Sequence, residues 1–169
     1  MKLKKIAQLG LLTAIALTIF LVEAQIPAPV PIPGVKLGLS NIVTVFTVFL
    51  LGAKEGAAVL ACRIFLGAVF GGNFSTILYS GAGGLLAILT TIGLKRVVTR
   101  KQLWVAGALS AIAHSVGQMI AAVTLTGTPT LLIYLPIMVV ISVFTGIFTG
   151  LCAQFLLNRG DKLWKTIFR

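Results

Sequence analysis

The chain has 169 residues, of which 58% are hydrophobic and only 10% are charged, and its mean hydropathy is +1.09. A soluble domain carries about 25% charged residues and could not hide so much apolar surface at this size. Disordered chains are excluded because they are poor in apolar residues, and a nucleic-acid-binding domain would need a soluble body beneath its basic residues. The composition therefore predicts an integral membrane protein, although the net charge is +11.

Six apolar segments follow one another along the chain, and a helix needs about 20 residues to cross a bilayer. They cover residues 6–22, 37–51, 57–70, 74–94, 103–125 and 131–157. The second and third are short, so we expect them to be tilted, partly enclosed by protein, or longer than hydropathy indicates. The sequence predicts one all-α domain over residues 1–169, built from six transmembrane helices.

The distribution of Lys and Arg supports this count, because positive residues gather on the cytoplasmic side of membrane proteins. With the N-terminus inside, twelve of the fourteen cations fall on the inner face. They are Lys2, Lys4, Lys5, Lys54, Lys95, Arg96, Arg100, Lys101, Arg159, Lys162, Lys165 and Arg169. We therefore expect both termini, a basic loop at 95–102 and a tail at 158–169 to be cytoplasmic, in the plasma membrane of a prokaryote.

The first segment has two readings. Residues 1–25 resemble a signal peptide, with a basic start and an apolar run, but that run is longer than the usual 7 to 15 residues of a signal core. We favour a retained first helix. Its small residues Gly10 and Ala14 form a face on which another membrane protein could dock.

A proline-rich strap, residues 24–36, is expected outside the cell. Pro27, Pro29, Pro31 and Pro33 alternate in it. Each proline fixes its own φ and favours an extended residue before it, so the strap should be stiff. It is either a rigid linker or, as we favour, a lid over an outward-facing cavity.

Polar side chains within the apolar segments are costly and usually face a cavity or a partner. Ser110, His114 and Gln118 are spaced by four, so they share one helix face. Helix rise places several polar residues in the outer half of the bundle, with Arg63 deeper but long enough to reach them. The sequence thus predicts a substrate-binding site that opens outward beneath the strap and consists of Glu23, Lys36, Asn41, Arg63, His114 and Gln118.

The roles of single residues stay open at this stage. Arg63 either forms a structural ion pair with Glu23, meets an anionic ligand, or binds carbonyl groups at a helix end. His114 either contributes to the site or hydrogen-bonds across helices. Lys36 and Arg63 against Glu23 favour an anionic or zwitterionic ligand.

Motifs of catalysis are absent from the sequence: there is no Walker loop, nucleophile elbow, zinc-protease motif or dinucleotide fingerprint. The three acids are Glu23, Glu55 and Asp161, which cannot supply an aspartate-rich magnesium site. We therefore expect no enzyme activity, no cofactor and no metal site, and any transport must draw its energy from a gradient or a partner. No acid lies at mid-membrane depth, which favours the partner.

Several motifs resemble one family. The run Pro-Ile-Pro-Gly-Val-Lys-Leu-Gly-Leu-Ser-Asn-Ile at 31–42 is similar to the signature of the Gx transporter family, also labelled heptaprenyl diphosphate synthase component I. Leu-Gly-Ala-Lys-Glu-Gly at 51–56, Arg-Ile-Phe-Leu-Gly at 63–67, Ser-Gly-Ala-Gly-Gly-Leu-Leu at 80–86 and Ala-His-Ser-Val-Gly-Gln at 113–118 fit the same family.

The family resembles the S components of energy-coupling factor transporters, which are six-helix membrane proteins that bind a small molecule near the outer face. This resemblance implies docking, through small residues such as Gly10 and Ala14, on a transmembrane coupling protein with two ATPases. We expect an S-component-like subunit that captures a small anionic or amphipathic molecule. It should contact membrane lipid and should not bind nucleic acid. The alternative is a non-catalytic accessory subunit of prenyl-quinone biosynthesis or of a flavin- or quinone-linked extracellular electron-transfer system.

Overall fold

The computed structural model describes residues 2–26, 36–72 and 74–167. These residues form six α-helices and two short 3-10 helices, and no β-strand occurs among them. In chain order the elements are α1 (Lys2–Glu23), α2 (Asn41–Leu50), α3 (Ala53–Gly71), α4 (Ser75–Leu94), η1 (Arg100–Gln102), α5 (Leu103–Thr126), η2 (Pro129–Tyr134) and α6 (Leu135–Ile167).

The six apolar segments therefore each contain a helix, but several bounds differ from the prediction, the clearest of them in the second and sixth helices. The second helix begins at Asn41 rather than near residue 37. The sixth begins at Leu135, after the 3-10 helix η2, and runs to Ile167, so most of the expected tail at 158–169 continues α6. Most of the strap lies outside the described residues, and its expected stiffness is therefore untested.

Four helical stretches are long and apolar enough to cross a membrane: Leu3–Glu23, Ser75–Leu94, Arg100–Thr126 and Pro129–Gly160. Large apolar side chains are exposed along them, among them Leu85, Phe144, Phe148 and Phe155. Contact with lipid hydrocarbon accounts for such a surface, which water would not tolerate over this area. The molecule has the build of a membrane-embedded helical protein.

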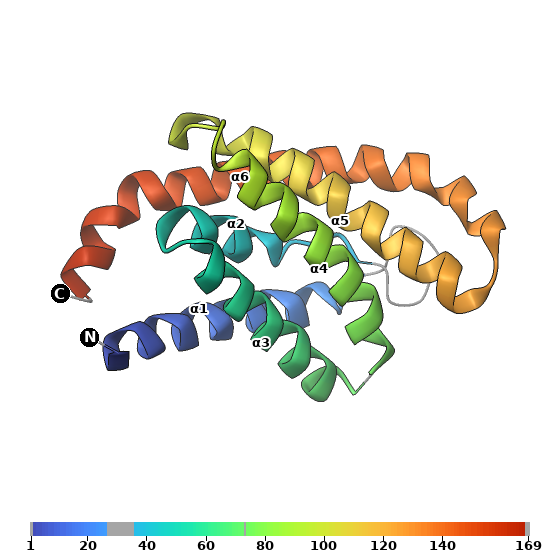
Figure 1. Ribbon diagram of the computed structural model, residues 1–169, viewed down its shortest axis with the longest axis horizontal. Coiled ribbons are helices and arrows are strands. Elements are labelled where there is room, and N and C mark those ends of the chain that lie inside the picture. Colours follow the sequence, from blue (N-terminus) through green and yellow to red (C-terminus); the bar gives the residue numbers. More distant parts are fainter. Residues whose placement is uncertain (1, 27–35, 73, 168–169) are drawn as a thin grey trace.

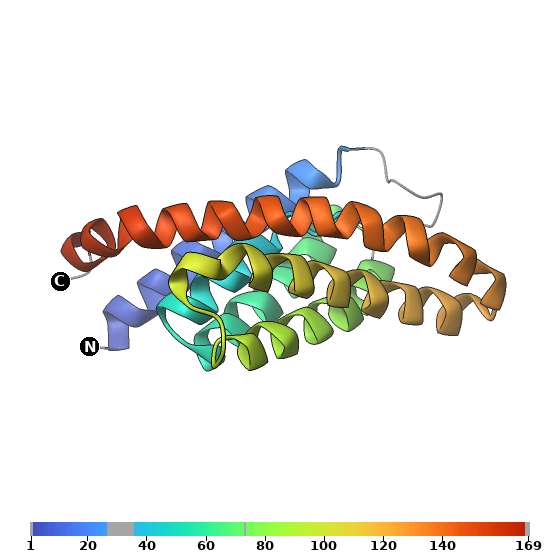
Figure 2. The same cartoon turned by 90° about the horizontal axis from the view of Figure 1, so that it is seen from above.

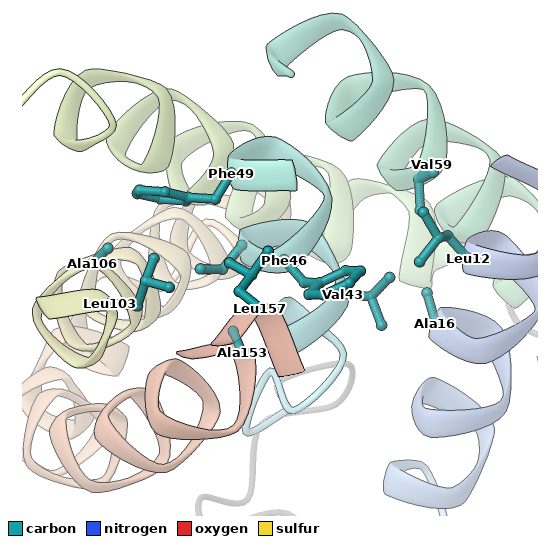
Figure 3. Packing of buried hydrophobic residues seen from close by; sticks show 11 residues of the cluster. Leu12, Ala16, Val43, Phe46, Phe49, Val59, Leu103, Ala106, Ala153 and Leu157 are labelled. Atoms are coloured by element: carbon teal, nitrogen blue, oxygen red, sulfur yellow. The ribbon is translucent and has the colours of Figure 1, made fainter. Parts of the chain in front are cut away.

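Helix α2 is short and lies in the interior. Its ten residues span about 15 Å, half the thickness of a bilayer's hydrocarbon core. Its β-branched residues favour helix weakly, so burial on all sides must stabilise it. Figure 3 shows Val43, Phe46 and Phe49 of α2 between side chains of α1 and α3 and side chains of α5 and α6.

Helices α4, α5 and α6 pack closely through glycines. Figures 1 and 2 show α5 and α6 running side by side. A methyl group added at Gly107 of α5 would collide with the Gly146 carbonyl oxygen and with the backbone of Gly150 in α6. One added at Gly117 would lie 2.5 Å from the Ala82 carbonyl oxygen of α4. Small residues thus bring three backbones into direct contact, as in other membrane bundles.

The start of α1 and the end of α6 lie at the same end of the molecule, which we call the terminal end (Figures 1 and 2). Two contacts of charged side chains mark it. Lys5 of α1 forms an ion pair with Glu55 in the first turn of α3, with 2.5 Å between Nζ and Oε1. Lys95, just after α4, donates from Nζ to the Val48 carbonyl oxygen near the end of α2, at 2.6 Å.

Candidate functional site

The last residue of α1 joins the segment that leads into α2. Glu23 is buried, and its Oε1 accepts a hydrogen bond of 2.5 Å from the backbone N–H of Gly38. Gly38 lies three residues before α2 begins, where the positive end of the helix dipole favours a carboxylate. Glu23, the last residue of α1, therefore holds the connection to α2, by which we mean residues 36–40.

Gly38 lies where the side chains of α2 and α5 meet. Its φ of +82° lies in the left-handed region, which glycine adopts without strain. A methyl group added there would lie 3.0 Å from Asn41 Nδ2 and 3.2 Å from His114 Cδ2. Both the backbone angle and the close approach therefore require glycine.

Gln118 of α5 binds the same connection. Oriented to satisfy its neighbours, its amide donates from Nε2 to the Lys36 carbonyl oxygen at 3.1 Å and accepts at Oε1 from the Lys36 N–H at 3.3 Å. The same Oε1 accepts from His114 Nε2 at 3.2 Å. Gln118 therefore pairs with the backbone of residue 36 much as a neighbouring strand would, and it fixes the imidazole of His114.

Phe20 connects the two cations. Lys36 Nζ lies 3.6 Å from the centroid of its ring, and Arg63 Cζ lies 5.3 Å from it. Gly67 of α3 lets the ring approach, since a methyl group there would lie 2.7 Å from Phe20 Cε1. Cations over an aromatic face are attracted by its quadrupole, by about 2 kcal/mol when desolvated. Arg63 meets this ring, and no ion pair joins it to Glu23 among the described contacts.

The six predicted site residues thus gather in one place, which we call the polar cluster: Glu23, Lys36, Asn41, Arg63, His114 and Gln118. Apart from the half-buried Lys36, none of them is more than 3% exposed. Burial also lowers the pKa of the Lys36 ammonium below its ordinary 10.5; Glu23 opposes this and Arg63 adds to it. Their positions agree with the prediction that these residues lie at similar heights in the bundle and so come close together. Their role in binding stays a prediction.

Buried polar atoms without a partner concentrate in the polar cluster. Among the described residues, the atoms of this kind are Glu23 Oε2, both amide atoms of Asn41, Arg63 Nη2, His114 Nδ1 and one atom elsewhere, Gln154 Oε1. Such atoms are rare, because each costs about 1 to 3 kcal/mol of desolvation, and more when charged. Five of these six atoms lie in the polar cluster, so this part of the interior leaves more hydrogen-bonding capacity unused than the rest of the described core.

The predicted polar stripe of α5 divides into two parts. His114 and Gln118 belong to the polar cluster, whereas Ser110 donates to the Ala87 carbonyl oxygen at 3.2 Å and accepts from Thr91 at 3.1 Å. Ser110 therefore joins α5 to α4 and plays no direct part in the cluster. The equal spacing could not distinguish these two environments.

Gly10 and Ala14 are both exposed on α1. A methyl group added at Gly10 would meet nothing within 4 Å. Their face of α1 is open, as the expected docking role requires, and the role itself stays a prediction.

Three residues of the site were missed by sequence reasoning: Phe20, Gly38 and Gly83. Phe20 lies three residues before Glu23, so helix spacing from the acid could have singled it out. Gly83 of α4 admits His114, since a methyl group there would lie 2.9 Å from its Cε1. No signal other than its place in a glycine-rich run marks Gly83.

The fold and the cluster together define a class of protein: an all-helical membrane bundle with a buried, partly unpaired polar site. Residues 12–156, most of the chain, match the family described as heptaprenyl diphosphate synthase component I, and the chain belongs to this family. No curated protein and no solved structure matches the chain.

Proposed function

We propose that the chain is a membrane subunit that captures a small molecule at the polar cluster from the outer face, with a partner supplying the energy to move it inward. The observation that carries the proposal is the group of five buried polar atoms without partners. A subunit whose helices only anchored a partner would have no need to bury them, because each one weakens the fold.

The proposal places both termini in the cytoplasm of a prokaryotic cell, so that the terminal end faces inward. The supporting pattern is the gathering of Lys and Arg, which makes the opposite end the outer one. Glu23, at the end of α1 remote from Lys5, then lies toward the outside. Reporter fusions at each terminus test this orientation, and a reporter active only outside the cell would contradict it.

The energising partner is expected on α1. The open face at Gly10 and Ala14 allows another helix to approach closely. Gly10→Leu should abolish co-purification of that partner without unfolding the protein, because Gly10 is exposed and an added methyl group there meets nothing within 4 Å. Gly93→Leu, at an equally open helical position of α4, is the matched control.

A second function is favoured by the family description, which names a component of heptaprenyl diphosphate synthase. In this case the chain is an accessory membrane subunit of prenyl-quinone formation. It would not be the catalytic subunit, because prenyl diphosphates are bound through magnesium on clustered aspartates, and the chain has one aspartate, Asp161. A related accessory role would serve a flavin- or quinone-linked electron-transfer system.

Gentle purification in native membrane patches, followed by native mass spectrometry, separates these functions. Capture predicts one small molecule bound per chain and its loss in Arg63→Gln. The accessory role predicts a stable soluble partner subunit and no small molecule. A chain that carries neither would contradict both.

A further inference from the structure

The polar cluster contains more positive than negative charge. Lys36 and Arg63 contribute two cations, and Glu23 contributes one anion. The other two acids of the chain are elsewhere: Glu55 pairs with Lys5 at the terminal end, and Asp161 lies in the last turns of α6. Residues 27–35, outside the described part, contain no ionisable side chain. No group of this chain can therefore balance the second cation.

The single negative charge of Glu23 is shared between the two cations, since it acts on both Lys36 and Arg63. Lys36 is half-buried and lies over Phe20. Arg63 is 2% exposed, with Nη2 unpartnered. Buried charge that is not fully balanced is unfavourable, so a further negative group beside Arg63 Nη2 would stabilise the cluster.

The remaining unpaired atoms describe the rest of that ligand. Arg63 Nη2 and Asn41 Nδ2 are donors and suit an anionic oxygen. Glu23 Oε2 and Asn41 Oδ1 are acceptors. Protonation of His114 would only enlarge the positive excess. The cluster thus offers donors to an anion and acceptors to a neighbouring hydroxyl or N–H group.

We propose that the polar cluster binds a compact organic anion of net charge −1, a carboxylate that carries a hydroxyl or N–H donor, in preference to a zwitterion or a neutral molecule. The inference rests on the proposed capture function and narrows its substrate class. A zwitterion satisfies Arg63 and Glu23 but leaves the excess charge in place, whereas a monoanion removes it.

The preference for a ligand of net charge −1, which we call the charge rule, can be tested with four small probes of similar shape: L-lactate, propionate, L-lactamide and L-alanine. Lactate has the charge and the donor, propionate only the charge, lactamide only the donor, and alanine is a zwitterion. With the protein in phosphatidylcholine nanodiscs at pH 7, ligand binding appears as a rise in the thermal midpoint. We expect lactate to raise it most and propionate less, with no effect of lactamide or alanine. The inference is overturned if all four probes raise the midpoint equally, or if neither lactate nor propionate raises it.

Variants place the effect at the cluster. Arg63→Gln should weaken lactate binding by about tenfold or more, the usual loss for a charged hydrogen bond. Glu23→Gln should tighten propionate binding, since the amide oxygen can still accept from Gly38, the net charge rises by one, and propionate has no hydroxyl that needs Glu23 Oε2 as an acceptor. A gain of affinity cannot come from misfolding, so this variant decides the test if Arg63→Gln does not fold. Lys54→Gln, an exposed change at the terminal end, should leave binding unchanged.

Two further measurements are needed. One distinguishes a lipid headgroup from a free ligand, and the other distinguishes failure of the charge rule from failure of the capture function. If phosphatidylglycerol nanodiscs abolish the lactate effect, a lipid headgroup occupies the site and the free-ligand inference is wrong. Native mass spectrometry gives the composition, and so the charge, of any molecule retained from the cell. A retained neutral molecule overturns the charge rule but leaves the capture function standing, while no retained molecule and no probe effect overturns both.

Discussion

The side-chain amide of Gln118 pairs with both backbone groups of Lys36, at 3.1 Å to its carbonyl oxygen and 3.3 Å to its N–H. This contact attaches residues 36–40, which lead into α2, to α5, just as the bond from Gly38 to Glu23 attaches them to α1. A segment held at both sides by side chains of the polar cluster can open only when these bonds break. Access to the cluster and the order of this segment should therefore be linked.

Gln118→Leu keeps the size of the side chain and removes the amide. We expect faster hydrogen exchange of the amides at residues 36–40, and a loss of about 1 to 3 kcal/mol of stability, because the backbone groups of Lys36 and the Nε2 of His114 lose their partner. Hydrogen–deuterium exchange with mass spectrometry in nanodiscs measures the first effect. Gln25→Leu, an exposed change in the turn after α1, is the control. Unchanged exchange at 36–40 would show that Gln118 does not hold the connection.

Gly38→Ala tests the close approach at the centre of the cluster. Both the φ of +82° and the crowding of Asn41 and His114 oppose the methyl group. Gly127→Ala is a matched control, because its φ of +64° is also left-handed while a methyl group there meets nothing within 4 Å. We expect about 1 kcal/mol of backbone cost in both variants and a further loss only at Gly38.

Ligand retention should separate the two variants more clearly than stability does. Gly38→Ala pushes on two side chains of the cluster and should release the bound molecule, whereas Gly127→Ala should retain it. Native mass spectrometry of both, prepared in parallel, gives the comparison. Equal retention would mean that the ligand does not depend on the positions of Asn41 and His114.

Much of the fold follows from hydropathy and charge, since each of the six apolar segments contains one helix. The start of α2 does not follow from hydropathy, because residues 37–40 are mostly apolar. The left-handed φ of Gly38 is what keeps the helix from beginning earlier than Asn41. The membership of the polar cluster was predictable from helix rise and spacing. The partner of Arg63 was not, since it depends on how closely α1 approaches α3 at Gly67, which charge alone does not reveal.

The ion pair of Lys5 and Glu55 predicts a pH dependence at the terminal end. The hydrogen bond from Lys5 lowers the pKa of the Glu55 carboxyl below its ordinary 4.5. A lowered pKa in the folded state means that this stabilisation is present above pH 4.5 and is lost as the pH falls through the lowered value. The pair is partly exposed, so the effect should not exceed about 1 kcal/mol.

The contribution of Glu55 is the difference in stability between wild type and Glu55→Gln, measured at pH 7 and at pH 3. Glu23 and Asp161 are present in both proteins, so their titration cancels in this difference. It should shrink as the pH falls. Lys5→Gln should give a similar loss at pH 7 and little additional loss in the double variant. Additive losses would mean that the two residues do not interact in the folded state.

The glycines between α5 and α6 are the last prediction. A methyl group at Gly107 would collide with the Gly146 carbonyl oxygen, and backbone cannot move aside as a flexible side chain can. Gly107→Ala should therefore cost about 1 to 3 kcal/mol through overpacking. Gly81→Ala, within α4 where a methyl group meets nothing within 4 Å, should instead be neutral or stabilise by up to about 1 kcal/mol, since alanine favours helix. Unfolding by SDS in mixed micelles compares the pair, and only Gly107→Ala is expected to lose stability. Equal effects would show that the close contact between α5 and α6 at Gly107 does not limit stability. These helices could then not be the fixed support from which Gln118 holds residues 36–40.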